Sequence, residues 1–425
     1  MRLLCFLVTV FMLLQVIFSN DIPKNDELGA NSSYDPDLNR NVSELISTKG
    51  YPVENHIVQT EDGFLLSVQR IPYGLLNKKA GNRKPVLLQH GFLGSSSDWV
   101  INFPHQSLGF ILADSGYDVW LGNTRGNTYS RNHISLDPNC TDFWRFSFDE
   151  MAEFDLPAMI DYILDETKAK SLSYIGHSQG TTVAFALLSE KPIYNEKINL
   201  FVALAPEVEV SHGKGVLSLK VAKYNEYMEG LFKMFGINEV FPNGPVMKSV
   251  TNLFCNSNVF NLCENFVFTL SGIDREQFNK TRLPVYMAHY PNGASTKNFL
   301  HYFQMAVSQK FRKYDHKREN RKHYKQDTPP EYDVSKIKTP TAIFWGMNDA
   351  LLDPEDISIL EKKLKSSLIY SYCIPWKDFN HIDFLIAKDA RELVYDHILN
   401  LLRNINADGR KLKLDNFFSN RELCQ

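Results

Sequence analysis

The stretch Ser171–Glu190, SLSYIGHSQGTTVAFALLSE, constrains this chain most, because it places one serine between a strand and a helix. A β-prone run at 172–175 leads into a G-x-S-x-G pentapeptide at 176–180, and a small, apolar helical pattern follows. The two glycines relieve crowding around a strained turn, and the helix directs its free N–H groups at any oxyanion that forms there. The strand before and the helix after distinguish this pentapeptide from an ordinary turn. The sequence therefore predicts that Ser178 is a nucleophile.

Strands alternate with helical segments along much of the chain, which predicts a mostly parallel sheet covered on both faces. The stretch 56–71 is expected to form a hairpin around Asp62-Gly63, which makes the sheet mixed. A helix is expected at 154–165. Further strands are expected at 85–89, 117–121, 198–204, 341–345 and 368–374.

This alternation stops in the long interval 207–332. Its centre, Phe235–Leu270, is apolar without clean periodicity, which suits the inner face of a lid; a purely structural helical subdomain is the alternative. We interpret the interval as a cap inserted into the sheet domain. The predicted division is a signal peptide at 1–19, an arm at 20–49, core segments at 50–206 and 333–405 around the insertion, and a tail at 406–425.

A serine nucleophile needs a base, and the base needs an acid that orients it. In a fold of this kind the acid and then the histidine follow late strands. Asp349 comes directly after the strand 341–345, and His381 lies in the loop after 368–374. Rival acids lie farther on, where Asp353-Pro354 reads as the start of a helix. The rivals are Asp353 and Asp356 for the acid, and His289, His301, His316, His323 and His397 for the base.

Two backbone N–H groups would form an oxyanion hole beside Ser178. Gln179, directly after the serine, supplies one. The other is expected from Phe92 in the loop His90-Gly91-Phe92, where Gly91 allows close approach. For His90 a structural role, bonding the loop to itself, is favoured over catalysis.

The N-terminus predicts export. Arg2 precedes the apolar run Leu3–Phe18, and polar residues follow, as in a cleaved signal peptide; a retained anchor is the alternative. No later stretch is long and apolar enough to span a bilayer, so the mature chain is expected to lack a transmembrane segment. A net charge of −3 argues against nucleic-acid binding.

Cysteines and glycosylation motifs fit an exported protein. Once Cys5 leaves with the signal, the five cysteines that remain include Cys255 and Cys263, which are close in sequence and are the expected disulfide. The odd number leaves at least one thiol free or paired with another chain, and Cys424 is a candidate. No Cys/His pattern has zinc spacing, and no metal is expected. Sequons predict N-glycosylation at Asn31, Asn41, Asn139 and Asn279.

The motifs taken together resemble the acid lipase family, the gastric and lysosomal lipases with their insect members. They are LLQHGFLGSSSDWV, LADSGYDVWLGNTRGN, FSFDEMAEFDLPAMIDYI, GHSQGTT, FWGMNDALLDP and FNHIDF. The resemblance covers about Tyr51 to Leu402. It implies an α/β-hydrolase fold, with a mostly parallel eight-stranded sheet and an inserted helical cap. It also implies Ser178 as nucleophile, Asp349 as acid and His381 as base, without a cofactor, and it likens Cys255–Cys263 to the family's lid disulfide.

The sequence thus predicts a serine lipase that acts on neutral lipid, triacylglycerol or cholesteryl ester, at a lipid–water interface. A general carboxylesterase for smaller esters and a non-catalytic lipid carrier are the alternatives. Phe92 stands where the family usually has leucine, a change that leaves the backbone N–H in place. The basic run Lys310–Lys325 either docks on an anionic lipid surface or is a solvated loop. The expected location is the secretory pathway, either secreted or lysosomal.

Overall fold

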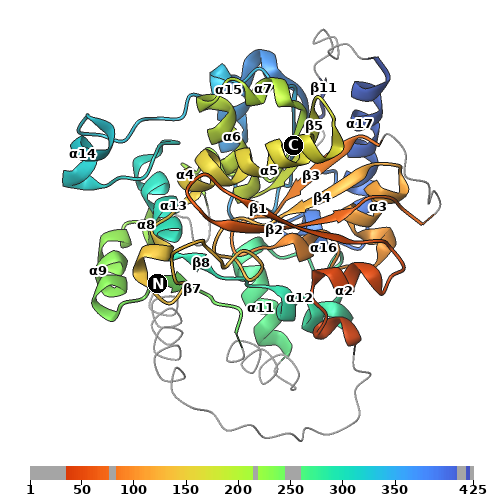
Figure 1. Ribbon diagram of the computed structural model, residues 1–425, viewed down its shortest axis with the longest axis horizontal. Coiled ribbons are helices and arrows are strands. Elements are labelled where there is room, and N and C mark those ends of the chain that lie inside the picture. Colours follow the sequence, from red (N-terminus) through yellow and green to blue (C-terminus); the bar gives the residue numbers. More distant parts are fainter. Residues whose placement is uncertain (1–34, 76–82, 214–218, 245–259, 409–417, 422–425) are drawn as a thin grey trace, which may run out of the picture.

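A computed structural model describes residues 35–75, 83–213, 219–244, 260–408 and 418–421. Within these residues a nine-stranded sheet, ordered β1-β2-β4-β3-β5-β6-β9-β10-β11, forms the centre of the molecule (Figure 1). Its strands are β1 (Glu54–Gln59), β2 (Leu65–Ile71), β3 (Pro85–Gln89), β4 (Asp118–Gly122), β5 (Leu172–His177), β6 (Ile198–Leu204), β9 (Thr341–Trp345), β10 (Leu368–Cys373) and β11 (Phe418–Ser419).

The sheet is mixed at one edge only. The turn at Asp62-Gly63 folds β2 back on β1, and β2 also pairs antiparallel with β4. From β4 to β11 all neighbours are parallel. Every residue of β3, β4, β5 and β9 is buried, as expected for strands covered on both faces.

Helices cover the two faces of the sheet. In Figure 1, α3 and α17 lie on one side of the sheet and α5 and α6 on the other. The helices of the sheet domain are α2 (Val42–Ser47), α3 (Leu108–Asp114), α4 (Phe148–Glu150), α5 (Leu156–Thr167), α6 (Gln179–Glu190), α7 (Tyr194–Lys197), α15 (Pro354–Leu364), α16 (Asp383–Ile386) and α17 (Asp396–Asp408).

Eight of the nine strands match the eight that were expected, with shifts of a residue or two at the ends. The ninth, β11, comes from the C-terminal tail and was not predicted, because two residues carry no periodic pattern. Side chains hold it in place: Phe418 stacks on Tyr370 at 4.8 Å, and the Asn420 amide accepts from the Cys373 N–H at 2.7 Å and donates to its carbonyl at 2.8 Å.

Between β6 and β9 the described chain forms further helices and a two-stranded sheet, β7 (Glu239–Val240) with β8 (Ala294–Ser295). Figure 1 shows α8, α9 and α13 together at one side of the sheet, with α11 and α12 nearby. These helices are α8 (Leu219–Ala222), α9 (Asn225–Phe235), α11 (Phe260–Ser271), α12 (Leu283–His289), α13 (Thr296–Ser308) and α14 (Asn320–Tyr324).

Several sequence predictions lie outside the described residues: the signal peptide, Asn31, Cys424, the Cys255–Cys263 disulfide and much of the apolar stretch within 235–270. Where the chain is described, Cys140 carries a free, exposed thiol, and Cys373 takes part in a disulfide. Asn41 and Asn139 are exposed and Asn279 is partly exposed. No helix in the described ranges has both the length and the apolar composition that a membrane crossing requires.

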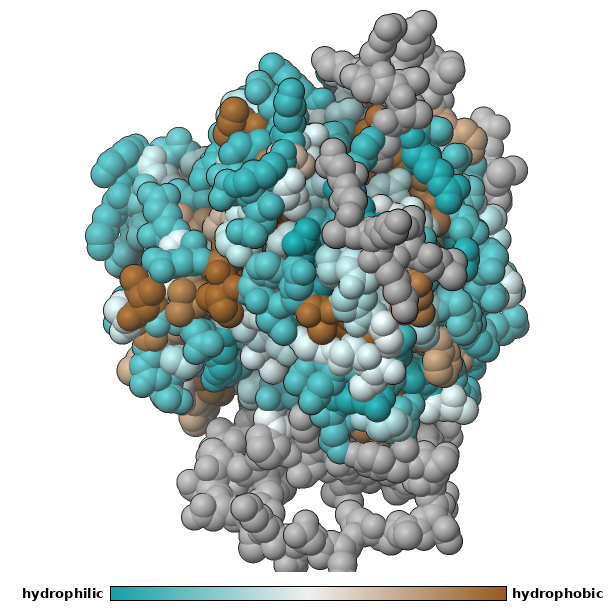
Figure 2. Space-filling model, turned by 45° about the vertical axis from the view of Figure 1, so that its right-hand side comes forward, coloured by the Kyte–Doolittle hydropathy of each residue, from teal (hydrophilic) through white to brown (hydrophobic). Residues whose placement is uncertain are grey.

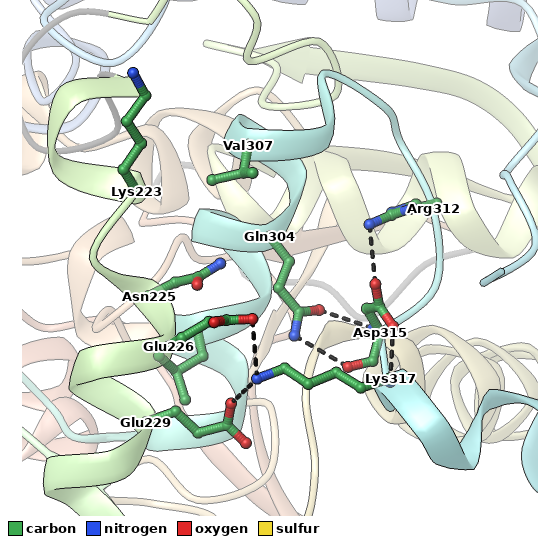
Figure 3. Close-up of a pocket in the computed structure, with 10 residues that line it drawn as sticks. Lys223, Asn225, Glu226, Glu229, Gln304, Val307, Arg312, Asp315 and Lys317 are labelled. Carbon is green, nitrogen blue, oxygen red and sulfur yellow. Dashed lines mark hydrogen bonds and ion pairs between the residues drawn. The ribbon is translucent and has the colours of Figure 1, made fainter.

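The basic run 310–325 has acidic partners. Lys313 pairs with Glu190 at 2.7 Å, and Lys317 pairs with Glu229 at 2.9 Å. Lys317 lines a cavity of about 290 Å³ between α9, α13 and this run, in which Lys317 pairs with acidic side chains of α9 and Arg312 pairs with Asp315 (Figure 3). The pairing favours a solvated loop over a docking site for anionic lipid. Figure 2 shows separate groups of hydrophobic residues on a mostly hydrophilic face.

Candidate active site

Ser178 lies between β5 and α6 in a strained backbone conformation, with φ 52° and ψ −122°. Its N–H donates to the Leu204 carbonyl of the neighbouring strand β6 at 2.9 Å. Both flanking glycines are required by packing. A Cβ at Gly180 would lie 2.4 Å from the Gln89 carbonyl oxygen, and one at Gly176 would lie 2.7 Å from the Gly180 carbonyl carbon. The turn therefore depends on α6 lying directly against the end of β3.

The loops after β9 and β10 bring Asp349 and His381 together. His381 Nδ1 lies 2.8 Å from Asp349 Oδ2, while Asp349 Oδ1 accepts the N–H groups of Leu351 at 2.8 Å and Leu352 at 3.1 Å. Burial lowers the pKa of His381, but the charge and hydrogen bond of Asp349, with a contribution from Glu207, outweigh it and raise the pKa above 6.5. This pair can hold an imidazolium.

The backbone of His381 is held from two sides. Its N–H donates to the Ser271 carbonyl at the end of α11 at 3.0 Å. Its carbonyl accepts from Nε2 of His177 at 2.8 Å. Burial, together with the charge of His381, lowers the pKa of His177 to about 3, so this ring is neutral and donates through Nε2. His177 is therefore a support for His381, a role that its place inside the pentapeptide did not reveal.

The loop after β3 lies against Ser178. A Cβ at Gly91 would come within 2.9 Å of the Ser178 Cβ. Within the described residues, neither the Phe92 nor the Gln179 backbone N–H donates to a protein acceptor. The Gln179 side chain is engaged elsewhere, since its Oε1 accepts from Asn298 at 2.6 Å. Two uncommitted amides thus lie beside the serine, as an oxyanion site requires.

His90 fixes the orientation of the Gly91–Phe92 peptide. Its Nε2 accepts the Thr124 N–H at 3.2 Å, so its Nδ1 carries the proton and donates to the Gly91 carbonyl at 2.8 Å. Burial lowers the pKa of His90 to about 4 and keeps the ring neutral. In a trans peptide the N–H points opposite to the carbonyl, so this bond turns the Phe92 N–H away from His90. His90 has the structural role expected for it.

Glu207, the third residue after β6 ends at Leu204, is a member of this cluster that the sequence reasoning missed. It is 2% exposed, and its Oε1 lies 3.8 Å from His381 Nε2. Burial, with the charge of Asp349, raises the pKa of Glu207 to about 7 against the opposing effects of His381 and Ser178. The signal that could have found it is its place at the carboxyl end of a parallel strand, where such sheets bind ligands.

The rival residues do not join the cluster. Asp353 caps α15 by accepting the Glu355 N–H at 3.0 Å, and Asp356 lies 2.8 Å from His212 Nδ1. The other histidines contact groups elsewhere: His289 the Asp37 carbonyl, His301 the Arg312 carbonyl, His397 the Tyr370 hydroxyl, and His316 and His323 each other. In the part of the chain that is described, no three His, Cys, Asp or Glu side chains are grouped to hold a metal ion.

Comparison with protein families gives two matches. Residues 42–103 match a partial α/β-hydrolase lipase region, and residues 84–234 match the α/β-hydrolase fold. Solved structures agree on the fold: a chain from Sulfolobus solfataricus superposes with a TM-score of 0.54 at 14% identity, covering 83% of this chain and 99% of that one. A chain from Acinetobacter baumannii gives 0.53 at 16% identity, covering 89% and 100%.

Similar proteins cover nearly the whole chain. Gastric triacylglycerol lipase of Bos taurus is 45% identical, over 86% of this chain and 92% of its own. Lipase member K of Homo sapiens is 42% identical, over 89% and 94%. Lysosomal acid lipase/cholesteryl ester hydrolase of Homo sapiens is 41% identical, over 88% and 94%. With this identity over this length, the chain belongs to the family of gastric and lysosomal acid lipases, and it is a carboxylic ester hydrolase of the α/β-hydrolase fold.

Proposed function

We propose that this chain is a serine lipase that hydrolyses esters of neutral lipids through an acyl-enzyme intermediate. One observation carries the proposal: the His381–Asp349 hydrogen bond of 2.8 Å is assembled beside a serine on a strained strand-to-helix turn. A strained nucleophile, a base oriented by a buried carboxylate and two uncommitted amides together form a set of groups that acyl transfer uses.

In the proposed reaction His381 Nε2 takes the Ser178 proton as Oγ attacks the ester carbonyl. The Phe92 and Gln179 amides bind the resulting oxyanion, each contributing about 3 kcal/mol in comparable sites. Collapse releases the alcohol, which takes the proton from His381, and leaves an acyl-serine. Water, activated by His381, then releases the fatty acid. Asp349 keeps the proton on Nδ1 and stabilises the imidazolium.

The substrate class rests on the relatives and on the walls of the site. The relatives are named for triacylglycerol and cholesteryl ester. Phe92 packs on Phe299 at 6.2 Å and on Tyr302 at 5.9 Å between ring centroids, so aromatic side chains from α13 border the oxyanion loop. Ser178 is only 4% exposed, so an ester reaches it after covering side chains move.

We place the chain in the secretory pathway, as its leader predicts and as the names gastric and lysosomal suggest.

The test is hydrolysis of emulsified triolein, cholesteryl oleate and a soluble short-chain ester at pH 5 and pH 7.5. Ser178→Ala is expected to lower kcat about 10⁴-fold or more, because the nucleophile is lost. Ser189→Ala, in the same helix with its hydroxyl bonded to Ala186, is the matched control and should keep activity.

Each alternative has its own outcome. Activity that survives in Ser178→Ala would overturn the serine mechanism. Cleavage of the short ester alone would favour a general carboxylesterase, and lipid binding without any hydrolysis would favour a carrier.

A further inference from the structure

The loop 91–94 beside Ser178 is bonded to the long insertion between β6 and β9. The Tyr290 hydroxyl, directly after α12, donates to the Phe92 carbonyl at 3.2 Å. The Asn292 N–H donates to the next carbonyl of the loop, that of Leu93, at 2.8 Å. Leu93 has a left-handed backbone with φ 61°, which a bulky residue keeps only where its surroundings fix it. Two donors of the insertion therefore hold the loop on the far side of Phe92.

The peptide on the near side of Phe92 is held within the loop itself. His90 Nδ1 and the Gly94 N–H, at 2.8 Å and 3.1 Å, both donate to the Gly91 carbonyl. The two peptide planes that meet at Phe92 are thus both bonded, while its own N–H has no acceptor among the described residues. Because both planes are fixed, the direction of the Phe92 N–H is fixed as well.

The same stretch of the insertion, residues 290–298, also reaches the second amide of the site. Asn298, fully buried in the first turn of α13, accepts the Phe148 N–H with its Oδ1 at 2.9 Å. Its Nδ2 is therefore the donor to the Gln179 side chain, at 2.6 Å. The cavity enclosed at this junction measures only about 10 Å³, enough for a single water at most, so the stretch packs directly against the loop and Gln179.

We propose that Tyr290 is a positioning residue of the oxyanion site: its hydroxyl, with the Asn292 N–H, holds the loop so that the Phe92 amide points at the oxyanion that forms on the ester. The inference rests on the proposed serine mechanism, in which that amide is a donor. Tyr290 acts through Phe92 and does not itself touch the ester. The insertion then does more than cover Ser178, because part of it holds the catalytic loop in place.

The phenol of Tyr290 stays a donor at acidic and neutral pH. Burial, with the charges of Asp98 and Glu207, raises its pKa, so the hydroxyl keeps the proton that it donates. Among the described residues, the bond to Phe92 is the single hydrogen bond of this hydroxyl. Tyr290→Phe therefore removes one contact and leaves the aromatic ring in place.

The experiment measures kcat and KM for a soluble short-chain ester, and Ki for 1,1,1-trifluorodecan-2-one. This ketone forms a hemiketal with a reactive serine and so places an oxyanion in the site. The wild type, Tyr290→Phe and Tyr286→Phe are compared. Tyr286→Phe is the matched control, because Tyr286 is a buried tyrosine of α12 whose hydroxyl donates to Asn102 Oδ1 at 3.3 Å and not to the loop.

Tyr290→Phe is expected to lower kcat about tenfold and to raise Ki about tenfold, with KM within twofold of the wild type. The reason is that a mis-aimed amide is lost mainly when the oxyanion forms. Tyr286→Phe should leave kcat, KM and Ki within twofold. Each variant loses one buried hydroxyl bond, so both should lower the melting temperature by a similar small amount. A merely structural role for Tyr290 would lower the melting temperature and leave kcat and Ki unchanged.

A kcat and a Ki within twofold of the wild type in Tyr290→Phe overturn the inference. A tenfold rise in KM at unchanged kcat also overturns it, because Tyr290 would then bind the substrate in its ground state. An equal loss of kcat in Tyr286→Phe does so too, because the effect would not be specific to the loop.

The two proposals fail separately. An active Ser178→Ala, or a wild type that the ketone does not inhibit, removes the serine mechanism itself. An inhibited wild type whose kcat and Ki are unchanged in Tyr290→Phe removes only the role of Tyr290.

Discussion

At the scale of single residues, His90 decides where one amide points. It holds the Gly91 carbonyl at 2.8 Å, and the trans peptide then aims the Phe92 N–H away from it. We expect His90→Ala to lower kcat for a soluble ester about 10²-fold with little change in KM, because a mis-aimed donor is lost mainly in the transition state. His105→Ala, at an exposed histidine, should be neutral. A kcat within twofold of the wild type in His90→Ala would remove Phe92 from the oxyanion site.

The buried carboxyl of Asp98 makes the free energy of unfolding depend on pH. Burial raises the pKa of Asp98 from 3.8 to about 7 in the folded protein, so the folded state holds this proton more tightly than the unfolded state. Its contribution is fully present below about pH 4, near the ordinary Asp value. It is lost as the pH rises through the folded pKa, by about 1.4 kcal/mol for each pKa unit.

Asp98→Asn cannot lose a proton there, so its free energy of unfolding should rise relative to the wild type as the pH goes from 4 to 7. Urea titrations at several pH values measure this difference. Asp165→Asn, at a surface carboxylate paired with Lys168, should keep a constant difference. A constant difference in Asp98→Asn would show that this carboxyl is not protonated in the fold.

At the scale of elements, one buried arginine joins the β1–β2 turn to the start of α5. The guanidinium of Arg125 bonds Asp62 in the turn at 2.6 Å and Asp155, which precedes α5, at 2.7 Å. Arg125 and Asp155 are fully enclosed, so removing Asp155 takes away the buried partner of the guanidinium and leaves it with the more exposed Asp62. Asp155→Ala is expected to lower the free energy of unfolding by about 3–5 kcal/mol in urea denaturation. The surface variant Asp165→Ala should cost less than about 1 kcal/mol, and a similarly small loss in Asp155→Ala would contradict the argument.

Elements with a strong local pattern were the ones that the sequence could predict. The strands β3, β6 and β9 were expected with their observed bounds, because a short apolar run with turn residues at its ends can be recognised from the sequence alone. The positions of Asp349 and His381 followed from chain order after such strands. The two-residue strand β11 could not be predicted, because its pairing depends on side chains of β10 far away in sequence.

Glu207 shows the same limit at the site. In sequence it reads as the first residue of an insertion, and only the pairing of β5 with β6 brings it beside Ser178. His177 could be recognised as a residue of the G-x-S-x-G pentapeptide. Its bond to the His381 carbonyl, however, depends on the position of the loop after β10. Sequence order thus predicted which residues meet, whereas their detailed contacts required the packed structure.

At the scale of the whole molecule, the hairpin β1–β2 forms one edge of the sheet and the tail strand β11 the other. An uncovered β10 would present unpaired amides and carbonyls, which is a template for pairing with another chain. Phe418, Asn420 and the bond of Arg421 to Glu361 occupy that edge instead. By covering the edge of β10, residues 418–421 therefore prevent this strand from pairing with a second molecule. An enzyme shortened to residue 408 should keep its catalytic groups, but it should precipitate at concentrations where the full chain stays in solution.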